Sequence, residues 1–133
     1  MTPLNRRSML SSIAAVVTGR WFAPRLRAQG KAPMYGLIGK MLATPGNRDA
    51  LVSILLEGTA RMPGCLSYVV ATDPSDPNAI WITEAWDNAD SHAASLKLPG
   101  VQQAIAKARP IIAGMGERFV TAPVGGHGLV AVP

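Results

Sequence analysis

Three observations predict an α+β domain. Four apolar runs bounded by turn residues predict strands, and two intervening segments place apolar residues at helical spacing. A turn rich in Pro and Asx residues joins the second and third runs directly, which predicts a hairpin. The resulting order, β-α-β-β-α-β, is the ferredoxin-like split arrangement. The predicted strands are residues 34–43, 65–72, 80–86 and 117–122, and the predicted helical segments are residues 47–62 and 87–108.

The first strand, residues 34–43 (MYGLIGKMLA), is apolar on both faces, which predicts a central or covered position in the sheet. Thr44-Pro45-Gly46 ends it. The helix that follows has its charged residues largely on one side and ends before Pro63-Gly64. Its apolar side carries Leu51, Ile54, Leu55 and Met62.

The hairpin turn is the segment 73–78, which contains two prolines and three Asx residues. After the third strand, Asp87 is predicted to cap the next helix, with Asp90 three positions on. Pro99-Gly100 interrupts that helix, which resumes over residues 101–108 and ends at Pro110.

Charge separates a leader from the domain. Five of the 13 basic residues lie in the first 30 positions, where there is no acidic residue. The other eight match the eight acidic residues of the remainder, so the domain is formally neutral despite a net charge of +5. A neutral domain lacks the electrostatic footprint of a nucleic-acid-binding protein.

The leader, residues 1–30, resembles a twin-arginine signal peptide, which predicts a periplasmic protein. Arg6-Arg7 precede a short apolar run, and Ala28-Gln29-Gly30 offers a cleavage pattern. Two alternatives stay open. Met34 as the true start would make the protein cytoplasmic, and an Arg-rich, acid-poor leader also suits an organelle transit peptide. A membrane span needs about 20 apolar residues in a row, and the sequence has no such run.

The remaining residues divide into a domain, 31–122, and a tail, 123–133. The tail is rich in Gly and Val, and its apolar character predicts packing on a partner subunit. A four-stranded sheet with helices on one face also leaves its other face to be covered. That face would carry either Ile80, Ile82 and Trp86 or Trp81 and Ala85, so a homodimer is expected.

Most motifs of catalytic sites are missing from the sequence. The two histidines, His92 and His127, have no metal-ligand spacing, and no metal site is predicted. There is no nucleophile elbow and no phosphate-binding loop. Gly114-Met115-Gly116 is too short to indicate a dinucleotide, so no cofactor is expected.

Glu84 and His92 are the candidate reactive pair. Glu84 lies in the middle of an apolar strand, where a carboxylate must find a partner or raise its pKa. His92 lies on the apolar side of the next helix, and a short turn joins the two elements. The alternatives are structural: His92 as a core residue, and Glu84 bonded to backbone or to an Arg across a dimer interface. Trp81, Trp86 and Tyr68 likewise suit core or interface positions.

Several segments in order resemble the antibiotic-biosynthesis-monooxygenase and quinol-monooxygenase family. They cover roughly residues 34–122: Met34-Tyr35-Gly36-Leu37-Ile38, Thr44-Pro45-Gly46, Pro63-Gly64-Cys65-Leu66-Ser67-Tyr68, Ile80 to Trp86 with Glu84-x-Trp86, and Leu96-Lys97-Leu98-Pro99. The resemblance implies a dimeric α+β barrel with a hydrophobic cavity in each subunit. It also implies oxidation of quinol-like or phenolic substrates by O₂ with no metal or flavin.

The sequence departs from the family pattern at two places. The family usually carries a His nine residues past the Trp, where this chain has Ser95; His92 lies one turn earlier. Heme-degrading members bring an Asn near Gly39 and a heme-ligating His near Ala104 or Ile105, so heme degradation is disfavoured.

The sequence therefore yields one leading hypothesis, a cofactor-independent monooxygenase that uses O₂ on a small electron-rich aromatic substrate. His92 would be the base or hydrogen-bond partner and Glu84 would orient it, while Trp86, Trp81, Tyr68 and Ser95 would contact the substrate. The alternative is a non-catalytic dimer that binds small aromatic compounds, since fold alone does not settle function.

Overall fold

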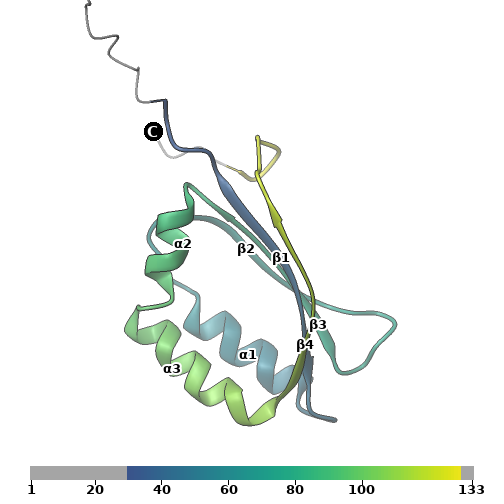
Figure 1. Ribbon diagram of the computed structural model, residues 1–133. Helices are drawn as coiled ribbons and strands as arrows, with labels where there is room; N and C mark the ends of the chain where they lie inside the picture. The colour runs from purple at the N-terminus through teal and green to yellow at the C-terminus, as the bar shows by residue number, and fades with distance from the viewer. Residues whose placement is uncertain (1–29, 130–133) are drawn as a thin grey trace, which may run out of the picture.

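Four antiparallel strands and three α-helices make up residues 30–129, the part of the chain that the computed structural model describes (Figure 1). The strands are β1 (Tyr35–Ala43), β2 (Cys65–Thr72), β3 (Ala79–Trp86) and β4 (Ile112–Thr121). The helices are α1 (Arg48–Gly58), α2 (Ala89–Ser95) and α3 (Pro99–Ala108), followed by the 3-10 turn η1 (Arg109–Ile111).

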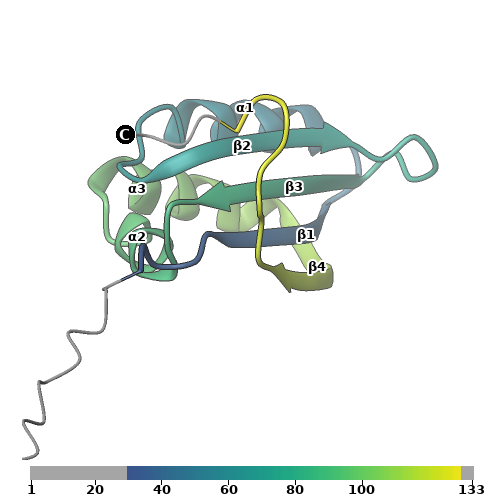
Figure 2. The same ribbon diagram turned by 90° about the horizontal axis from the view of Figure 1, so that it is seen from above.

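The sheet has the order β2-β3-β1-β4, so β1 is central, as its two apolar faces predicted. All three pairings are antiparallel. The helices lie together over one face of the sheet, and the described chain has no helix over the other (Figures 1 and 2). This arrangement confirms the ferredoxin-like α+β fold.

Strand periodicity decides which residues meet the helices. Ile80 and Ile82 of β3 pack in the core with Leu51 of α1 and Ala108 of α3. Because side chains alternate along a strand, Trp81, Thr83 and Ala85 point to the opposite, open face. Of the two alternatives that the sequence left, the face without helices is therefore the one that carries Trp81 and Ala85, and the chain after β4 crosses part of it (Figure 2).

The first helix ends earlier than predicted, at Gly58 rather than Met62. Gly58 lies against α3 so closely that a Cβ there would collide with the Cβ of Ala104. The hydroxyl of Thr59 then bonds the Leu55 carbonyl at 2.6 Å, which satisfies one of the last carbonyls of the helix. The close packing of α1 against α3 and this hydrogen bond end the helix at Gly58, although the apolar pattern in the sequence continues to Met62.

The cap of α2 is Asn88, so the prediction of Asp87 was wrong. The Asn88 side chain accepts from the backbone N–H of Ser91 at 2.8 Å. The backbone N–H of Asp87 instead donates to the Gly64 carbonyl at 2.9 Å, which continues the hydrogen bonding between β3 and the chain before β2. Strand pairing therefore displaces the start of the helix by one residue.

The last strand begins at Ile112, five residues before the predicted start at position 117. Its first half contains Gly114 and Gly116, which hide the strand pattern in the sequence. Register shifts opposite Gly39/Met41 and Leu42/Ala43 further disturb its alternation against β1.

The leader prediction falls almost wholly on residues 1–29, which lie outside the described residues, as do residues 130–133. Residues 123–129 of the tail have no helix or strand, and Val124 is 95% exposed. Packing of the tail on a partner subunit stays a prediction. No helix in the described range is both long and apolar enough to cross a membrane.

Candidate functional site

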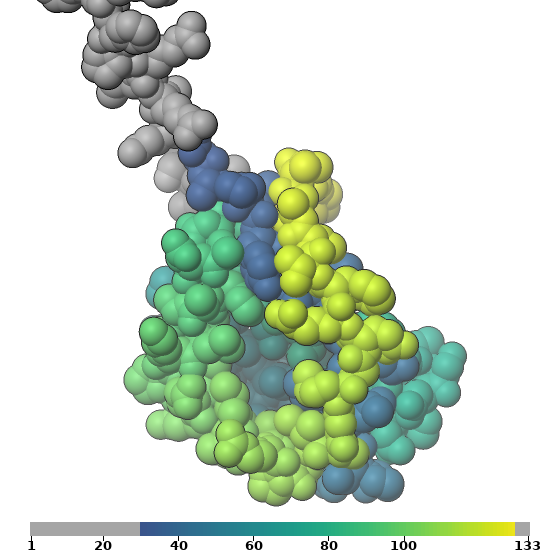
Figure 3. Space-filling view, in the orientation of Figure 1, coloured from purple at the N-terminus to yellow at the C-terminus, as the bar shows by residue number. Residues whose placement is uncertain are grey.

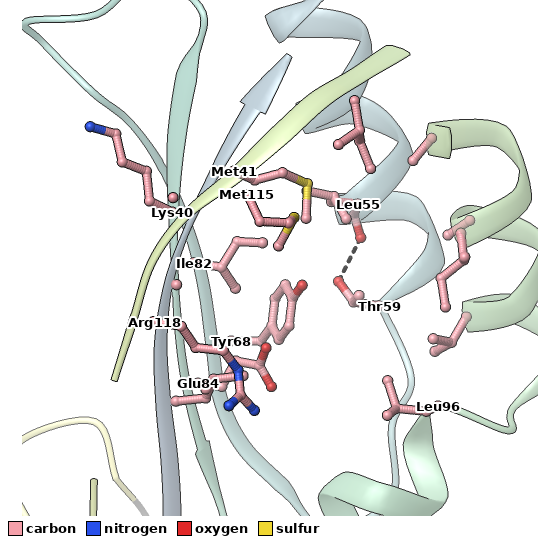
Figure 4. Close-up of a pocket in the computed structure, with 18 of the residues that line it drawn as sticks. Lys40, Met41, Leu55, Thr59, Tyr68, Ile82, Glu84, Leu96, Met115 and Arg118 are labelled. Carbon is pink, nitrogen blue, oxygen red and sulfur yellow. Dashed lines mark hydrogen bonds between the residues drawn. The ribbon is translucent and has the colours of Figure 1, made fainter. Parts of the chain in front are cut away.

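A cavity of about 360 Å³ lies between the helix-covered face of the sheet and helices α1 and α3. Figure 3 shows its mouth as a hollow between β4 and the helices, and Figure 4 shows its interior. Leu96 and Met115 line the cavity and are 47% and 65% exposed, so the mouth is open to solvent in a single chain. The wall is largely apolar: Leu37, Met41, Leu55, Ile82, Leu96, Val101, Ala104, Ile105, Ala108, Ile112 and Met115.

Polar side chains gather at one end of this cavity. Tyr68 of β2, Glu84 of β3 and Arg118 of β4 lie near one another there, away from Met41 and Met115 at the other end (Figure 4). Strand pairing explains why Tyr68 and Glu84 lie close together. Tyr68 is directly opposite Glu84, and side chains at paired positions of neighbouring strands point to the same face of the sheet. A ligand in this cavity would therefore be oriented by groups at one end only.

Two aromatic side chains that do not line the cavity, those of Trp86 and His92, contact the carboxylate of Glu84. The indole N–H of Trp86 donates to its Oε2 at 2.8 Å, and Nε2 of His92 lies 3.7 Å from the same oxygen. Burial raises the pKa of Glu84, an effect that is opposed by the Trp86 hydrogen bond and by the charges of His92 and Arg118. The carboxylate is thus fixed, partly desolvated and turned toward the cavity.

His92 points inward as predicted, and the predicted approach to Glu84 is observed. Its ring lies between Tyr35, at a centroid distance of 4.9 Å, and Trp86, at 5.5 Å. His92 does not line the cavity. It therefore contacts Glu84 from outside the cavity, and its predicted role as base or hydrogen-bond partner of a substrate stays a prediction.

Of the other predicted site residues, only Tyr68 lines the cavity. Burial raises its pKa well above the ordinary value of 10.0, helped by the charges of Glu84 and Cys65, so its phenol stays protonated. Trp86 is 1% exposed and contacts Glu84 rather than the cavity. Of all the site residues predicted from the sequence, only Glu84 and Tyr68 therefore line the cavity.

Trp81 and Ser95 do not line the cavity, and their contact with a substrate stays a prediction. Trp81 faces the open side of the sheet, where its indole donates to Asp73 Oδ2 at 3.0 Å. Ser95 is 4% exposed, and its hydroxyl donates to the His92 carbonyl at 2.7 Å. The hydroxyl of Ser95 is therefore hydrogen-bonded within α2, one turn from His92.

Arg118 is the cavity residue that the sequence analysis missed. It lies opposite Gly39 in the pairing of β1 with β4, and Gly39 shares a face with Leu37 and Met41. The predicted last strand did contain Arg118, but nothing in its sequence told which face was inward. The inward direction of Arg118 becomes evident only from the pairing of β4 with β1.

The described residues offer no group of three His, Cys, Asp or Glu side chains placed to hold a metal ion. Gly39, Ala104 and Ile105, the positions at which heme-degrading relatives were expected to differ, all line the cavity. None of the three has a side chain that can bind iron. The residues at these positions therefore do not fit a heme site of that type.

The chain belongs to the antibiotic biosynthesis monooxygenase family, which it matches over residues 34–107. The fold is shared with the "putative Antibiotic biosynthesis monooxygenase" of Chloroflexus aurantiacus J-10-fl, at 68% identity and a TM-score of 0.71, over 73% of this chain and 99% of that one.

More distant proteins of the same description share the fold. The one from Caulobacter crescentus CB15 is 18% identical, with a TM-score of 0.64 over 71% of this chain and 93% of that chain. The one from Nitrosomonas europaea is 14% identical, also with a TM-score of 0.64, over 70% of this chain and 92% of that chain. A comparison with curated proteins found no match.

Proposed function

We propose that the protein is a monooxygenase that oxidises a small electron-rich phenol or quinol with O₂, using no metal or organic cofactor. The observation that carries this proposal is the cavity with Glu84 at its polar end. The space is lined mainly by apolar side chains, and a fixed carboxylate within it can accept a proton from a bound hydroxyl. Membership of a family whose members are named as monooxygenases supports it.

Glu84 takes the role of base in this proposal, and His92 becomes a positioning residue. A carboxylate whose pKa is raised by burial is, when ionised, a stronger base than an exposed one. His92 and Trp86 hold Oε2 from behind, which leaves Oε1 for the substrate. The phenol of Tyr68 lies opposite and can donate to a substrate oxygen.

The reaction balances without an external reductant. Glu84 removes the hydroxyl proton, and the resulting electron-rich anion passes electrons to O₂. In a phenol with a free para position, the C–H bond para to the hydroxyl breaks; in a 1,4-hydroquinone, a ring C–H bond next to one oxygen-bearing carbon breaks and the product is a hydroxyquinone. One oxygen atom of O₂ is bonded to that carbon, and the other leaves as water. A phenol thus becomes a quinone, and all four electrons that O₂ accepts come from the substrate. The protein supplies deprotonation, orientation and exclusion of water.

The proposed enzyme is a homodimer joined through the open face of the sheet. That face includes Val69, which is 50% exposed, and Phe119, which is 54% exposed and lies opposite Ile38. No helix of the described chain covers it (Figure 2). A second copy of the sheet would bury these side chains and would close the two sheets into an α+β barrel.

Oxygen uptake by the purified full-length chain tests the function, with naphthohydroquinones, anthrols and catechols as substrates. We expect uptake above autoxidation that chelators do not affect. Glu84→Gln should lower turnover about 10²-fold or more, because a positioned base contributes that much. Glu57→Gln, an exposed change on α1 outside the cavity, is the matched control.

The variant His92→Ala distinguishes a role of His92 in positioning Glu84 from a purely structural role. Because the charge of His92 lowers the pKa of Glu84, its loss should move the limb of the pH–rate profile that reports Glu84 to higher pH. Turnover should fall about 10²-fold with the fold intact. A wild-type rate and an unmoved profile would remove His92 from the mechanism, and background uptake across the whole panel would overturn the proposed reaction.

One observation favours a second function, a non-catalytic binding protein for small aromatic compounds. The mouth of the cavity is open between β4 and the helices (Figure 3), and a catalytic cavity of this type needs to be dry. Saturable binding of the same compounds without oxygen uptake would support this second function over the first.

A further inference from the structure

Arg118 brings a positive charge to the cavity, where it lowers the pKa of Glu84 without forming an ion pair with it. Its guanidinium lies beside the Glu84 carboxylate at the polar end (Figure 4), yet the two do not come within ion-pairing distance. Among residues 30–129 no acidic side chain forms an ion pair with Arg118. Five N–H donors in a planar fork are therefore available to a ligand.

Lys40, the other cation that lines the cavity, is already occupied. Its Nζ lies 3.4 Å from Asp73 Oδ2 and 5.3 Å from the centre of the Trp81 ring. Figure 4 shows its side chain directed away from the cavity. The positive charge available to a ligand at this site is thus that of Arg118.

The position of Arg118 suits a ligand that is apolar at one end and anionic at the other. Arg118 is exposed at the rim, so an anion beside it keeps part of its hydration, and the rings enter the apolar interior. An apolar cavity of about 150 Å³ holds one benzene ring. The volume of about 360 Å³ therefore suits two or three fused rings.

We propose that Arg118 is the specificity-determining residue of the cavity and selects a fused-ring aromatic that carries one anionic oxygen group. The group is a carboxylate or an ionised phenolic oxygen, since the guanidinium fork pairs with either. This inference rests on the proposed function only in using the same cavity. It requires binding, and no turnover.

Anaerobic binding to the full-length chain tests the proposal, with 2-naphthoate and its neutral counterpart 2-naphthamide. Wild-type protein should bind the naphthoate at least about tenfold more tightly, because charge-assisted hydrogen bonds are worth that much. Arg118→Gln should abolish this preference and leave naphthamide binding nearly unchanged. Arg118→Lys should keep part of it, since it retains the charge and loses the fork.

Lys97→Gln is the matched control, because Lys97 is an exposed cation that does not line the cavity. It should leave both affinities unchanged. Glu84→Gln should tighten naphthoate binding by removing a neighbouring negative charge. This second variant keeps the proposal testable even if Arg118→Gln were to lower stability.

A third ligand distinguishes the two sources of the anionic oxygen. If Arg118 selects an ionised phenolic oxygen, bound 2-naphthol should show the absorption of naphtholate at a pH where free naphthol is neutral, and Arg118→Gln should remove that signal. If only naphthoate shows the preference, the anchor is an acidic substituent.

Equal affinity of wild-type protein for naphthoate and naphthamide would overturn the inference, as would no binding of any of the three compounds. Because no oxygen is present, the result is independent of turnover. A strong naphthoate preference without oxygen uptake would uphold the role of Arg118 and reject the monooxygenase. Uptake without the preference would do the reverse.

Discussion

Two pairs of a tryptophan and a carboxylate lie on opposite faces of the same sheet, and they differ in one respect. On the helix-covered face, the indole of Trp86 donates to Glu84 at 2.8 Å. On the open face, the indole of Trp81 donates to Asp73 at 3.0 Å. The donor is the same, but the pKa of Glu84 is raised and that of Asp73 is lowered.

The surroundings explain the difference. The backbone N–H of Ser75 and the Trp81 indole lower the pKa of Asp73, with a further contribution from Lys40. Glu84 has one strong donor and lies against an apolar cavity, so burial outweighs the hydrogen bond. An indole–carboxylate contact is thus a structural anchor in one place and part of a candidate site in the other.

The two faces of the sheet also differ in the functions that we expect of them. The helix-covered face lines a cavity that holds a carboxylate of raised pKa, and the open face carries an ion pair among exposed apolar side chains. We expect chemistry on the first face and association on the second. Substitutions on the two faces test this division.

The largest effect is expected from Phe119→Asp on the open face. In the proposed homodimer this change places a carboxylate in the interface, which should weaken association about 30-fold or more, as at a central interface residue. Leu56→Asp is the control, since Leu56 on α1 and Phe119 are both 54% exposed. Analytical ultracentrifugation over a range of concentrations measures both. Equal dimerisation by the two variants would show that the open face is not the interface.

A smaller effect is expected from removing one indole donor on each face while keeping an aromatic ring. Trp86→Phe should lower the free energy of unfolding by about 1.5–3 kcal/mol, because it leaves a desolvated carboxylate without its donor. Trp81→Phe should cost much less, since Asp73 keeps the Ser75 N–H and Lys40. Urea unfolding near neutral pH compares the variants. Similar losses would mean that the Ser75 N–H and Lys40 do not compensate Asp73 for the lost indole donor.

The smallest effect is a pair of opposite pH dependences. The folded-state pKa of Asp73 lies below 3.8, so its stabilisation is present above pH 3.8 and is lost as pH falls through the folded value. The folded-state pKa of Glu84 lies above 4.5, so its contribution is complete below pH 4.5 and is lost as pH rises through the folded value.

Asp73→Asn should therefore reduce the loss of stability in acid, and Glu84→Gln should reduce the loss on going from acid to neutral pH. Calorimetric melting temperatures between about pH 3 and pH 8 test both variants against the wild type. Changes of the same sign in the two variants would contradict the assigned pKa directions.

Much of the fold was predictable because its signals are local. The hairpin of β2 and β3, the break before α3 and the inward position of His92 follow from turn residues and periodicity, and the structure confirms them. The end of α1 at Gly58, the cap at Asn88 and the start of β4 at Ile112 depend on contacts with distant elements. Those contacts carry no signal in the local sequence.

The site divides in the same way. That Glu84 is a carboxylate within an apolar strand, with His92 one short turn away, follows from the order of the residues and from the two-residue period of a strand. That His92 contacts Glu84 from outside the cavity, that Trp81 faces away from the cavity and that Arg118 faces toward it follows from the packing of the folded chain. The reason is physical: which face of a strand becomes the interior depends on where the helices pack and how the strands register, and both are non-local properties.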